Sequence, residues 1–175
     1  MKLTKSFEQG VCIMAIMATQ EEGVPVSSRT LQSRVGSSMT YMQKLLRKLV
    51  VAGMIKSAPG ANGGFVLAKP ISDISVLDVV TALEGDIDSY PSTGLFSQVF
   101  DRPVATKTAY AADRAMQRIF RAADNMWKQT LAEISLDDIV ARVLTADMKT
   151  PKIDWNNETL VASNIAIGRK EFMHA

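Results

Sequence analysis

Apolar residues recur at helical spacing near the start of the chain and predict a first helix from about Thr4 to Thr19. Successive apolar positions stand three or four residues apart, which places them on one face of an α-helix; they are Leu3, Phe7, Val11, Met14 and Ala18. A polar break at residues 21–25, which contains a glycine and a proline, ends this pattern. The first helix is therefore expected to present one apolar face to a core.

Two shorter helices follow, separated by a single glycine. The pattern predicts them over Ser27–Val35 and Ser37–Ala52, with Gly36 between them and Gly53 at the left-handed position that commonly ends a helix. Their apolar residues are spaced so that the two helices can pack on each other; these are Leu31, Val35, Met39, Met42, Leu45, Leu46 and Leu49. This arrangement is typical of a helix-turn-helix.

The next apolar runs are short and bounded by glycine, so they predict strands. The runs Met54–Ser57 and Phe65–Ala68 flank a loop, 58–64, in which Asn62-Gly63 favours a turn with positive φ. Helix, turn, helix and hairpin, in this order, make a winged helix. Its second helix would enter the major groove of DNA, and its hairpin would contact the flanking backbone or minor groove. We therefore predict a mostly α fold with a small β-hairpin wing.

The second half of the chain is organised around one long helix. Ser75–Asp78 is a capping box that opens a short helix, and residues 86–103 are predicted to form a linker with at most one helical turn. The long helix is predicted over 104–133. A second capping box, Ser135–Asp138, opens a further helix to about Ala146.

These elements predict a DNA-binding domain over 1–85, the linker over 86–103, and a dimerisation unit over 104–147. Residues 148–175 are polar and weakly patterned, and no particular structure is predicted for them. The long helix carries a heptad seam of mostly small residues, which suits close packing against a partner helix. The predicted dimer interface consists of Ala109, Ala112, Met116, Ile119, Ala123 and Met126.

The composition is that of a soluble intracellular protein. No apolar run approaches the roughly 20 residues that cross a membrane, and the charged N-terminus lacks the apolar core of a signal peptide. We therefore expect a cytoplasmic protein without membrane contact. One cysteine, Cys12, allows no internal disulfide and no cysteine metal cage, and the one histidine, His174, lies next to the C-terminus. With so few nucleophiles and metal ligands, we expect no enzyme activity, no metal and no cofactor.

Basic residues are concentrated in the first part of the chain. Residues 1–69 contain nine Lys or Arg and three Glu, whereas residues 70–175 contain eleven basic and fifteen acidic residues. A basic surface is expected where a protein binds phosphates, although an ordinary solvated surface can have the same composition. The coincidence with the helix-turn-helix favours phosphate binding. The candidate phosphate contacts are Lys5, Arg29, Arg34, Arg47, Lys48 and Lys56.

The second helix of the pair begins with side chains that can read bases. Residues at this end of a recognition helix reach base edges. A Gln can pair with adenine through two hydrogen bonds, a Thr offers a hydroxyl and a methyl group, and a Lys can bond guanine or a phosphate. The candidates are Ser38, Thr40, Tyr41, Gln43 and Lys44. In an isolated helix the same residues would be solvated surface, but the hairpin that follows favours DNA reading.

The glycine-rich loop of the hairpin has two interpretations. A loop that cradles a nucleotide phosphate would be followed by Lys and Ser or Thr, and then by a helix; neither condition is met. The loop is therefore interpreted as a DNA-binding wing, formed by Pro59, Gly60, Asn62, Gly63 and Gly64.

Four segments, in this order, resemble one family of bacterial transcription regulators. They are Met1–Ser6, Tyr41–Leu45, the pattern Gly60-x-x-Gly63-Gly64-Phe65-x-Leu67, and Ile74–Gly85. The family is Rrf2, and the resemblance covers about residues 1–146. Within it, the chain is similar to the cluster-free branch that includes the cysteine metabolism repressor. The resemblance implies a homodimeric repressor, joined through the long helix, with two winged helices on a pseudo-palindromic operator.

Three departures from the family pattern bear on function. Members that bind an iron–sulfur cluster carry three cysteines between the short helix and the long one, whereas Asp86–Pro103 contains none here. Because thiolates hold such clusters, this chain cannot bind one in that way. The family's minor-groove Arg corresponds to Pro59, and an acidic residue common in its recognition helix corresponds to Gln43. These changes argue against minor-groove reading by the wing and predict a different preferred operator.

The features together predict a dimeric, sequence-specific regulator whose partner is double-stranded DNA. One alternative is a winged helix used as a protein-interaction module, which would not distinguish an operator from random DNA. Another adds a small-molecule, redox or protein effector near residues 86–127, in a pocket lined by Phe96, Val99, Phe100, Tyr110 and Trp127. Cys12 is a separate redox candidate. A lone helix cysteine is commonly a packing residue, and a redox role would need an intermolecular bond or an adduct.

Overall fold

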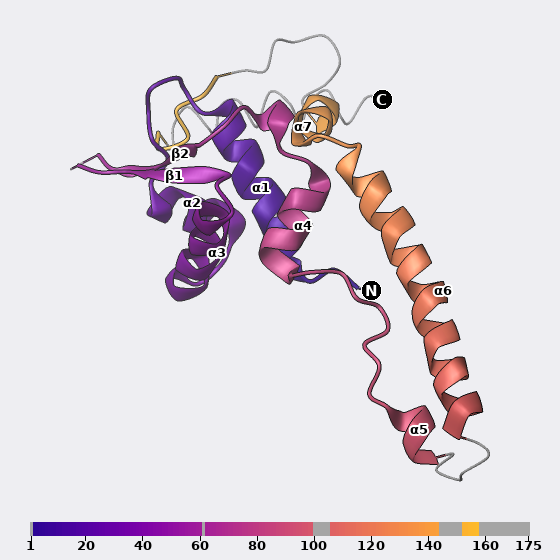
Figure 1. Ribbon diagram of the computed structural model, residues 1–175. Coiled ribbons are helices and arrows are strands. Elements are labelled where there is room, and N and C mark those ends of the chain that lie inside the picture. Colours follow the sequence, from indigo (N-terminus) through magenta and orange to yellow (C-terminus); the bar gives the residue numbers. More distant parts are fainter. Residues whose placement is uncertain (1, 61, 100–105, 144–151, 158–175) are drawn as a thin grey trace, which may run out of the picture.

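In the computed structural model, which describes residues 2–60, 62–99, 106–143 and 152–157, a helical body carries a projecting hairpin and a long arm (Figure 1). The first elements are α1 (Lys5–Thr19), α2 (Ser28–Val35), α3 (Met39–Val51), β1 (Ile55–Ala58) and β2 (Gly64–Leu67). The mostly α fold with a β-hairpin wing is thus confirmed, and the predicted ends of these elements differ from the observed ones by at most two residues.

Hydroxyl side chains cap the first three helices. The Thr4, Ser27 and Ser38 side chains each accept a hydrogen bond from a backbone N–H in the first turn, which satisfies one of the donors that a helix leaves free there. Gly36 ends α2 with a φ of 65°, in the left-handed region where a side chain would be strained. The turn between α2 and α3 therefore depends on this glycine.

The hairpin is antiparallel and is bonded to Val26, two residues before α2. Its register runs from the pair Ile55–Leu67 to the pair Ala58–Gly64. Val26 and Phe65 exchange two backbone hydrogen bonds of 3.0 and 2.9 Å. A Cβ at Gly64 would lie 2.3 Å from the Val26 carbonyl oxygen, so only glycine allows this approach. The wing is therefore fixed to the start of α2.

The turn of the wing differs from the prediction. The glycine with positive φ is Gly60, at 119°, and Gly63 has no positive φ. The Gly63 N–H donates to the Gly60 carbonyl over 3.0 Å, and a Cβ at Gly63 would lie 2.7 Å from the Ala58 carbonyl oxygen. Gly63 is thus required for close backbone approach, and the left-handed position falls at Gly60.

One core joins the winged helix to the helix that follows the arm. α4 (Val76–Glu84) packs against α1, where a Cβ at Gly10 would lie 2.2 Å from Leu83 Cδ1. α7 (Leu136–Val143) returns to the same core, and Leu136 is 1% exposed. The most deeply buried side chains include Ile13, Met14, Leu31, Met42, Leu46, Leu49, Ile55, Ile74 and Val79. Both predicted capping boxes, at Ser75–Asp78 and Ser135–Asp138, are present.

The arm leaves the body after α4 and returns through α6. It contains α5 (Leu95–Val99), a short helix within the described part of the predicted linker, and α6 (Thr106–Ala132) (Figure 1). A short 3₁₀ helix, η1 (Ile71–Asp73), precedes α4. Among the described residues, no helix is long and apolar enough to span a membrane.

Carboxylates on α6 hold the first part of the linker. Asp124 accepts hydrogen bonds from the Ser89 hydroxyl and backbone N–H, and these bonds hold the pKa of Asp124 below its usual range. Asp113 accepts from Tyr90, Ser92 and Gln117 side chains over 3.2, 2.7 and 2.9 Å. The linker is therefore attached to α6 by polar contacts, to which the stacked rings of Tyr90 and Phe120 add an apolar one.

Candidate nucleic-acid interface

α3 exposes one polar face on the side opposite the core. Met42, Leu45, Leu46 and Leu49 are buried, and the residues three or four positions apart on the opposite side are exposed: Thr40, Gln43, Lys44 and Arg47. None of these four side chains donates to or accepts from another described side chain. The face from Thr40 to Arg47 is about 10 Å long, at 1.5 Å per residue. The structure thus brings four of the predicted contacts together on one exposed face.

Two other candidates on α3 have partners within the molecule. The Tyr41 and Ser6 hydroxyls share a hydrogen bond of 2.5 Å, and Tyr41 is half-buried against the core. The Lys48 ammonium donates to the Leu83 carbonyl at the end of α4. Tyr41 and Lys48 stand seven residues apart, two turns of helix, so they share the flank of α3 that meets α1 and α4. We therefore leave both out of the proposed DNA contacts.

Lys48→Ala is expected to affect stability more than DNA binding. The Leu83 carbonyl would lose its charged donor, which should lower the free energy of unfolding by about 0.5–1.5 kcal/mol. Urea denaturation measures this loss, and Lys44→Ala is the matched control on the exposed face. A Lys48→Ala variant with unchanged stability and a reduced salt dependence of DNA binding would contradict this assignment.

The wing presents its tip to solvent. Pro59, Gly60 and Asn62 are exposed, whereas Gly63 and Gly64 are half-buried where the backbone approaches Ala58 and Val26. Lys56 is exposed on β1, opposite Val66. The wing therefore offers backbone groups, one amide side chain and a lysine to a neighbouring molecule.

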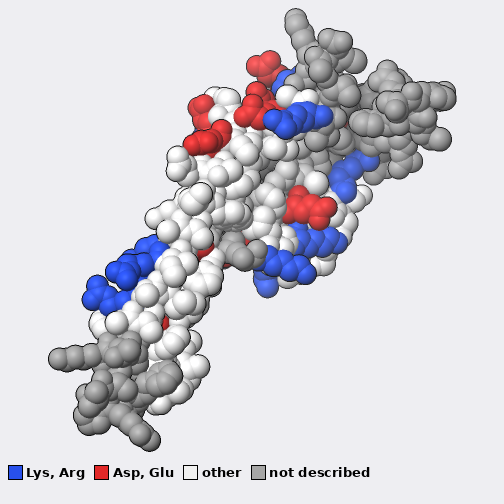
Figure 2. Space-filling view, turned by 90° about the vertical axis from the view of Figure 1, so that its right-hand side faces the viewer, with Lys and Arg blue, Asp and Glu red and all other residues white. Residues whose placement is uncertain are grey.

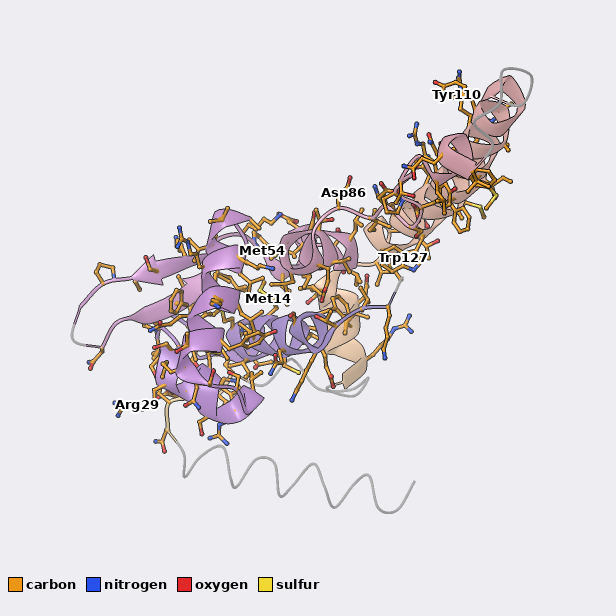
Figure 3. All side chains as sticks on the ribbon, turned by 90° about the horizontal axis from the view of Figure 1, so that it is seen from below. Met14, Arg29, Met54, Asp86, Tyr110 and Trp127 are labelled. Carbon is orange, nitrogen blue, oxygen red and sulfur yellow. The ribbon has the colours of Figure 1, made fainter. Side chains whose placement is uncertain are left out.

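The remaining basic candidates are spread over α1 and α2. Lys5 is exposed at the first residue of α1. Arg29 lies in the first turn of α2 and points away from the core (Figure 3). On the face seen in Figure 2, Lys and Arg side chains form several groups with acidic side chains between them. The interface is thus defined by the α3 face more than by one continuous basic patch.

Arg34 has a partner that the sequence did not predict. Its guanidinium carbon lies 5.9 Å from the centre of a Trp155 ring, a cation–π distance. Trp155 and Asn156 belong to the segment predicted to have no particular structure, yet they contact α1 and α2. A tryptophan in an otherwise polar tail was the available signal, because exposed tryptophans are uncommon in such tails.

The predicted seam of α6 is largely uncovered. Ile119 and Met126 are 62% and 72% exposed, Ala123 is exposed, and Ala112 and Met116 are half-buried. The Ala109 side chain lies outside those that the structure describes. An apolar stripe of this kind on an extended arm is typical of a protein–protein contact.

The cavity beside α6 is polar. It has a volume of about 440 Å³ and is lined by residues that include Asp86, Tyr90, Gln117, Phe120 and Lys128. Phe96, Val99, Tyr110 and Trp127, which were predicted to line an effector pocket, do not line it, and Phe100 lies outside the described residues. Val99 and Tyr110 are 64% and 58% exposed, whereas the carboxylates of α6 accept hydrogen bonds from Ser89 and Ser92.

Cys12 lies exposed on α1. Although the residue is exposed overall, neighbouring atoms partly desolvate its thiol and raise the thiol pKa, and the Glu8 carboxylate raises the pKa further. The thiolate is the reactive form, so this environment does not favour a redox role.

A helix-turn-helix with an exposed polar face, a wing and an arm with an apolar seam defines a winged-helix transcription regulator. The chain belongs to the Rrf2 family, since the family model described as "Iron-dependent Transcriptional regulator" matches residues 3–142. The protein is therefore a DNA-binding regulator of transcription and not an enzyme.

Individual relatives agree with this assignment. YwgB of Bacillus subtilis, named as an HTH-type transcriptional regulator, is 30% identical over 143 residues, which cover 82% of this chain and 86% of YwgB. YffB of Lactococcus lactis is 34% identical over 139 residues, which cover 79% of this chain and 86% of YffB. Among solved structures, IscR of T. potens matches with a TM-score of 0.58 at 24% identity, over 85% of this chain and 94% of IscR. Oxidised CymR of Staphylococcus aureus matches with a TM-score of 0.57 at 21% identity, over 85% of this chain and 100% of CymR. These two likenesses establish the fold.

Iron appears in the family description, but the residues present do not fit an iron–sulfur cluster. The sequence has no cysteine in 86–103, and the described residues include no group of three or more His, Cys, Asp or Glu that could hold a metal ion. Asp113 and Asp124, the buried carboxylates of the arm, are already bonded to the linker. No step in the proposed function depends on iron.

Proposed function

We propose that the protein is a homodimeric repressor that reads a pseudo-palindromic operator with α3 and contacts the flanking DNA with the wing, in the bacterial cytoplasm. The observation that carries this proposal is the exposed face of α3, where Thr40, Gln43, Lys44 and Arg47 project together. A polar face of this length on the second helix of a helix-turn-helix matches the major groove in shape and chemistry.

The side chains of the interface divide by chemistry. Thr40 and Gln43 carry groups that match base edges, and Lys44 carries a charge that suits guanine or a phosphate. Ser38 caps α3 through the Tyr41 N–H, so its hydroxyl sets the position of the helix and borders the bases. The proposed phosphate contacts are Lys5, Arg29, Arg34, Arg47 and Lys56. Phosphate contacts hold the protein on the duplex, and the base contacts choose the sequence.

A homodimer is proposed because the apolar stripe on α6 could pack against the same stripe of a second copy. Ile119, Ala123 and Met126 are exposed apolar or small residues on one face of a 27-residue helix. Two copies of this helix related by a two-fold axis would cover the same stripe on each other. A palindromic operator requires that the same axis place the two α3 helices on one side of the dimer.

Selection from a random DNA library tests the proposal. The purified protein should recover a palindromic consensus with half-site centres roughly 34 Å apart, one turn of duplex. Recovery of unrelated sequences would favour the protein-interaction alternative. A reporter with the selected operator across its promoter should be expressed less when the protein is present, and increased expression would overturn repression.

Pro59→Arg is expected to tighten DNA binding. An arginine at the wing tip could enter a narrow minor groove, where the negative potential is enhanced, and this should raise affinity roughly threefold to tenfold on operators with A·T-rich flanks. Pro59→Gln is the control, because it removes the proline without adding charge. Titration by fluorescence anisotropy measures both. Equal affinities of the two variants would show that the wing tip lies away from the groove.

A further inference from the structure

Residues 152–157 form a short segment, here called the C-terminal segment, that lies against the end of α1 (yellow in Figure 1). The Ile153 N–H donates to the Thr19 carbonyl over 2.9 Å, and the Glu21 N–H donates to the Ile153 carbonyl over 3.1 Å. The Lys152 ammonium donates to the Ala18 carbonyl over 2.8 Å. The segment thus supplies partners to backbone groups where α1 ends.

Buried polar side chains of the body also depend on this segment. Thr19 and Gln20 are 4% and 6% exposed. The Trp155 indole N–H donates to the Thr19 hydroxyl over 2.8 Å, and the Trp155 backbone N–H donates to the Gln20 amide oxygen over 3.0 Å. The Gln20 amide nitrogen donates to Asp154 over 3.1 Å. Because unpaired buried polar groups are costly, these bonds indicate that the segment is part of the folded body.

Asn156 holds residues 25–27, which link α1 to α2 and contact the wing through Val26. Its amide oxygen accepts from the Ser27 N–H over 3.0 Å, and its amide nitrogen donates to the Pro25 carbonyl over 3.0 Å. Between them, Val26 is paired with Phe65 of the wing. Successive groups of an extended backbone point to opposite sides. The wing therefore holds one side of this connection and Asn156 holds the other.

The same amide lines a groove together with two proposed DNA contacts. Asn156 also accepts from the Thr30 hydroxyl in the first turn of α2, over 3.0 Å. Arg29 of α2, Asn62 of the wing and Asn156 line one groove. A change at Asn156 would thus alter how α2 and the wing are placed relative to each other. The match to the family model ends at residue 142, so the segment lies beyond the matched region.

We propose that Asn156 is a positioning residue for DNA binding, which sets the placement of α2 and the wing on the DNA backbone. This inference rests on the proposed function, since it names a further residue that acts on the same interface. Asn156 acts through Pro25, Ser27 and Thr30. Its replacement should leave the exposed face of α3 unchanged. Its loss should therefore weaken phosphate contacts and spare base preference.

The test uses the full chain, the selected operator and a scrambled duplex of equal length. Asn156→Ala should weaken binding to both duplexes by a similar factor, roughly threefold to tenfold, the equivalent of one or two hydrogen bonds. It should also reduce the salt dependence of binding. In an Arg29→Ala background the added loss should be smaller, because the phosphate contact that Asn156 supports is already gone. Asn125→Ala, an exposed amide on α6, is the matched control and should bind like wild type.

Asn156→Gln keeps an amide that can accept from Ser27 and donate to Pro25, and it adds no charge beside the phosphates. It should therefore retain more affinity than Asn156→Ala, even if the alanine variant proves unstable. Wild-type affinity of both variants on both duplexes would overturn the inference, as would tighter binding or a loss confined to the operator. If the wild-type protein shows no preference for any operator, the proposed function fails. The effect of Asn156→Ala on scrambled DNA would then still decide this inference separately.

Discussion

Replacing Ile119 and Met126 together by glutamate is expected to leave the protein monomeric. Both side chains are exposed on the seam of α6, so the change should not disturb the body of a single chain. In a two-fold dimer, however, it would bring carboxylates of both chains into a dry contact. Burying like charges without partners costs several kcal/mol, so the dimer dissociation constant should rise by roughly 100-fold or more.

Sedimentation equilibrium measures this change directly. Asn125→Glu combined with Gln129→Glu is the control, because these residues are exposed on the polar face of the same helix. The control should remain dimeric. A dimer of unchanged mass for the Ile119 and Met126 variant would show that the two chains meet through another surface.

Loss of the dimer should also weaken operator binding. Each monomer carries one α3 face, so it can engage one half-site only. Two linked winged helices gain affinity because the second binds at a high effective concentration. A monomer that bound the full operator as tightly as wild type would contradict the proposed arrangement of two α3 helices.

The winged helix was predictable because its elements are determined by residues that are close together in the sequence. The apolar spacing of α1 and α3, Gly36 and the two capping boxes each depend on residues within one or two helical turns. These patterns placed Gln43 and Lys44 on the exposed face of α3, where the structure has them. They could not place Tyr41 and Lys48, whose partners Ser6 and Leu83 lie far along the chain.

The arm shows a second limit of sequence patterns. Aromatic spacing suggested a pocket, but the structure uses Asp113 and Asp124 to hold the linker to α6. Acidic residues on a helix usually lie in solvent. The neighbouring sequence does not show which of these carboxylates will accept hydrogen bonds from a segment more than twenty residues away. The C-terminal segment is a similar case, because the contacts of Asn156 with Pro25, Ser27 and Thr30 join residues more than 120 positions apart.

Gln43→Ala is expected to reduce discrimination between sequences. The Gln43 side chain is exposed on the α3 face, one turn from Thr40 and Arg47, and has no hydrogen-bond partner among the described residues. A glutamine there can form two hydrogen bonds with adenine in the major groove. Removing it should cost about 1–3 kcal/mol on the best operator, or about fivefold to 150-fold in affinity.

The loss on random DNA should be small, because the phosphate contacts remain. Lys44→Ala is the control on the same face. If Lys44 binds a phosphate, this variant should weaken operator and scrambled duplex alike and lower the log–log salt slope by about 1 per subunit. Gln43→Glu should shift the preferred base in each half-site toward cytosine, whose amino group a carboxylate accepts from. Salt-dependent titration of the three variants against the two duplexes separates these outcomes. If Gln43→Ala lowered both affinities equally, α3 would be holding the duplex without reading it, and the basic surface would be a general electrostatic contact.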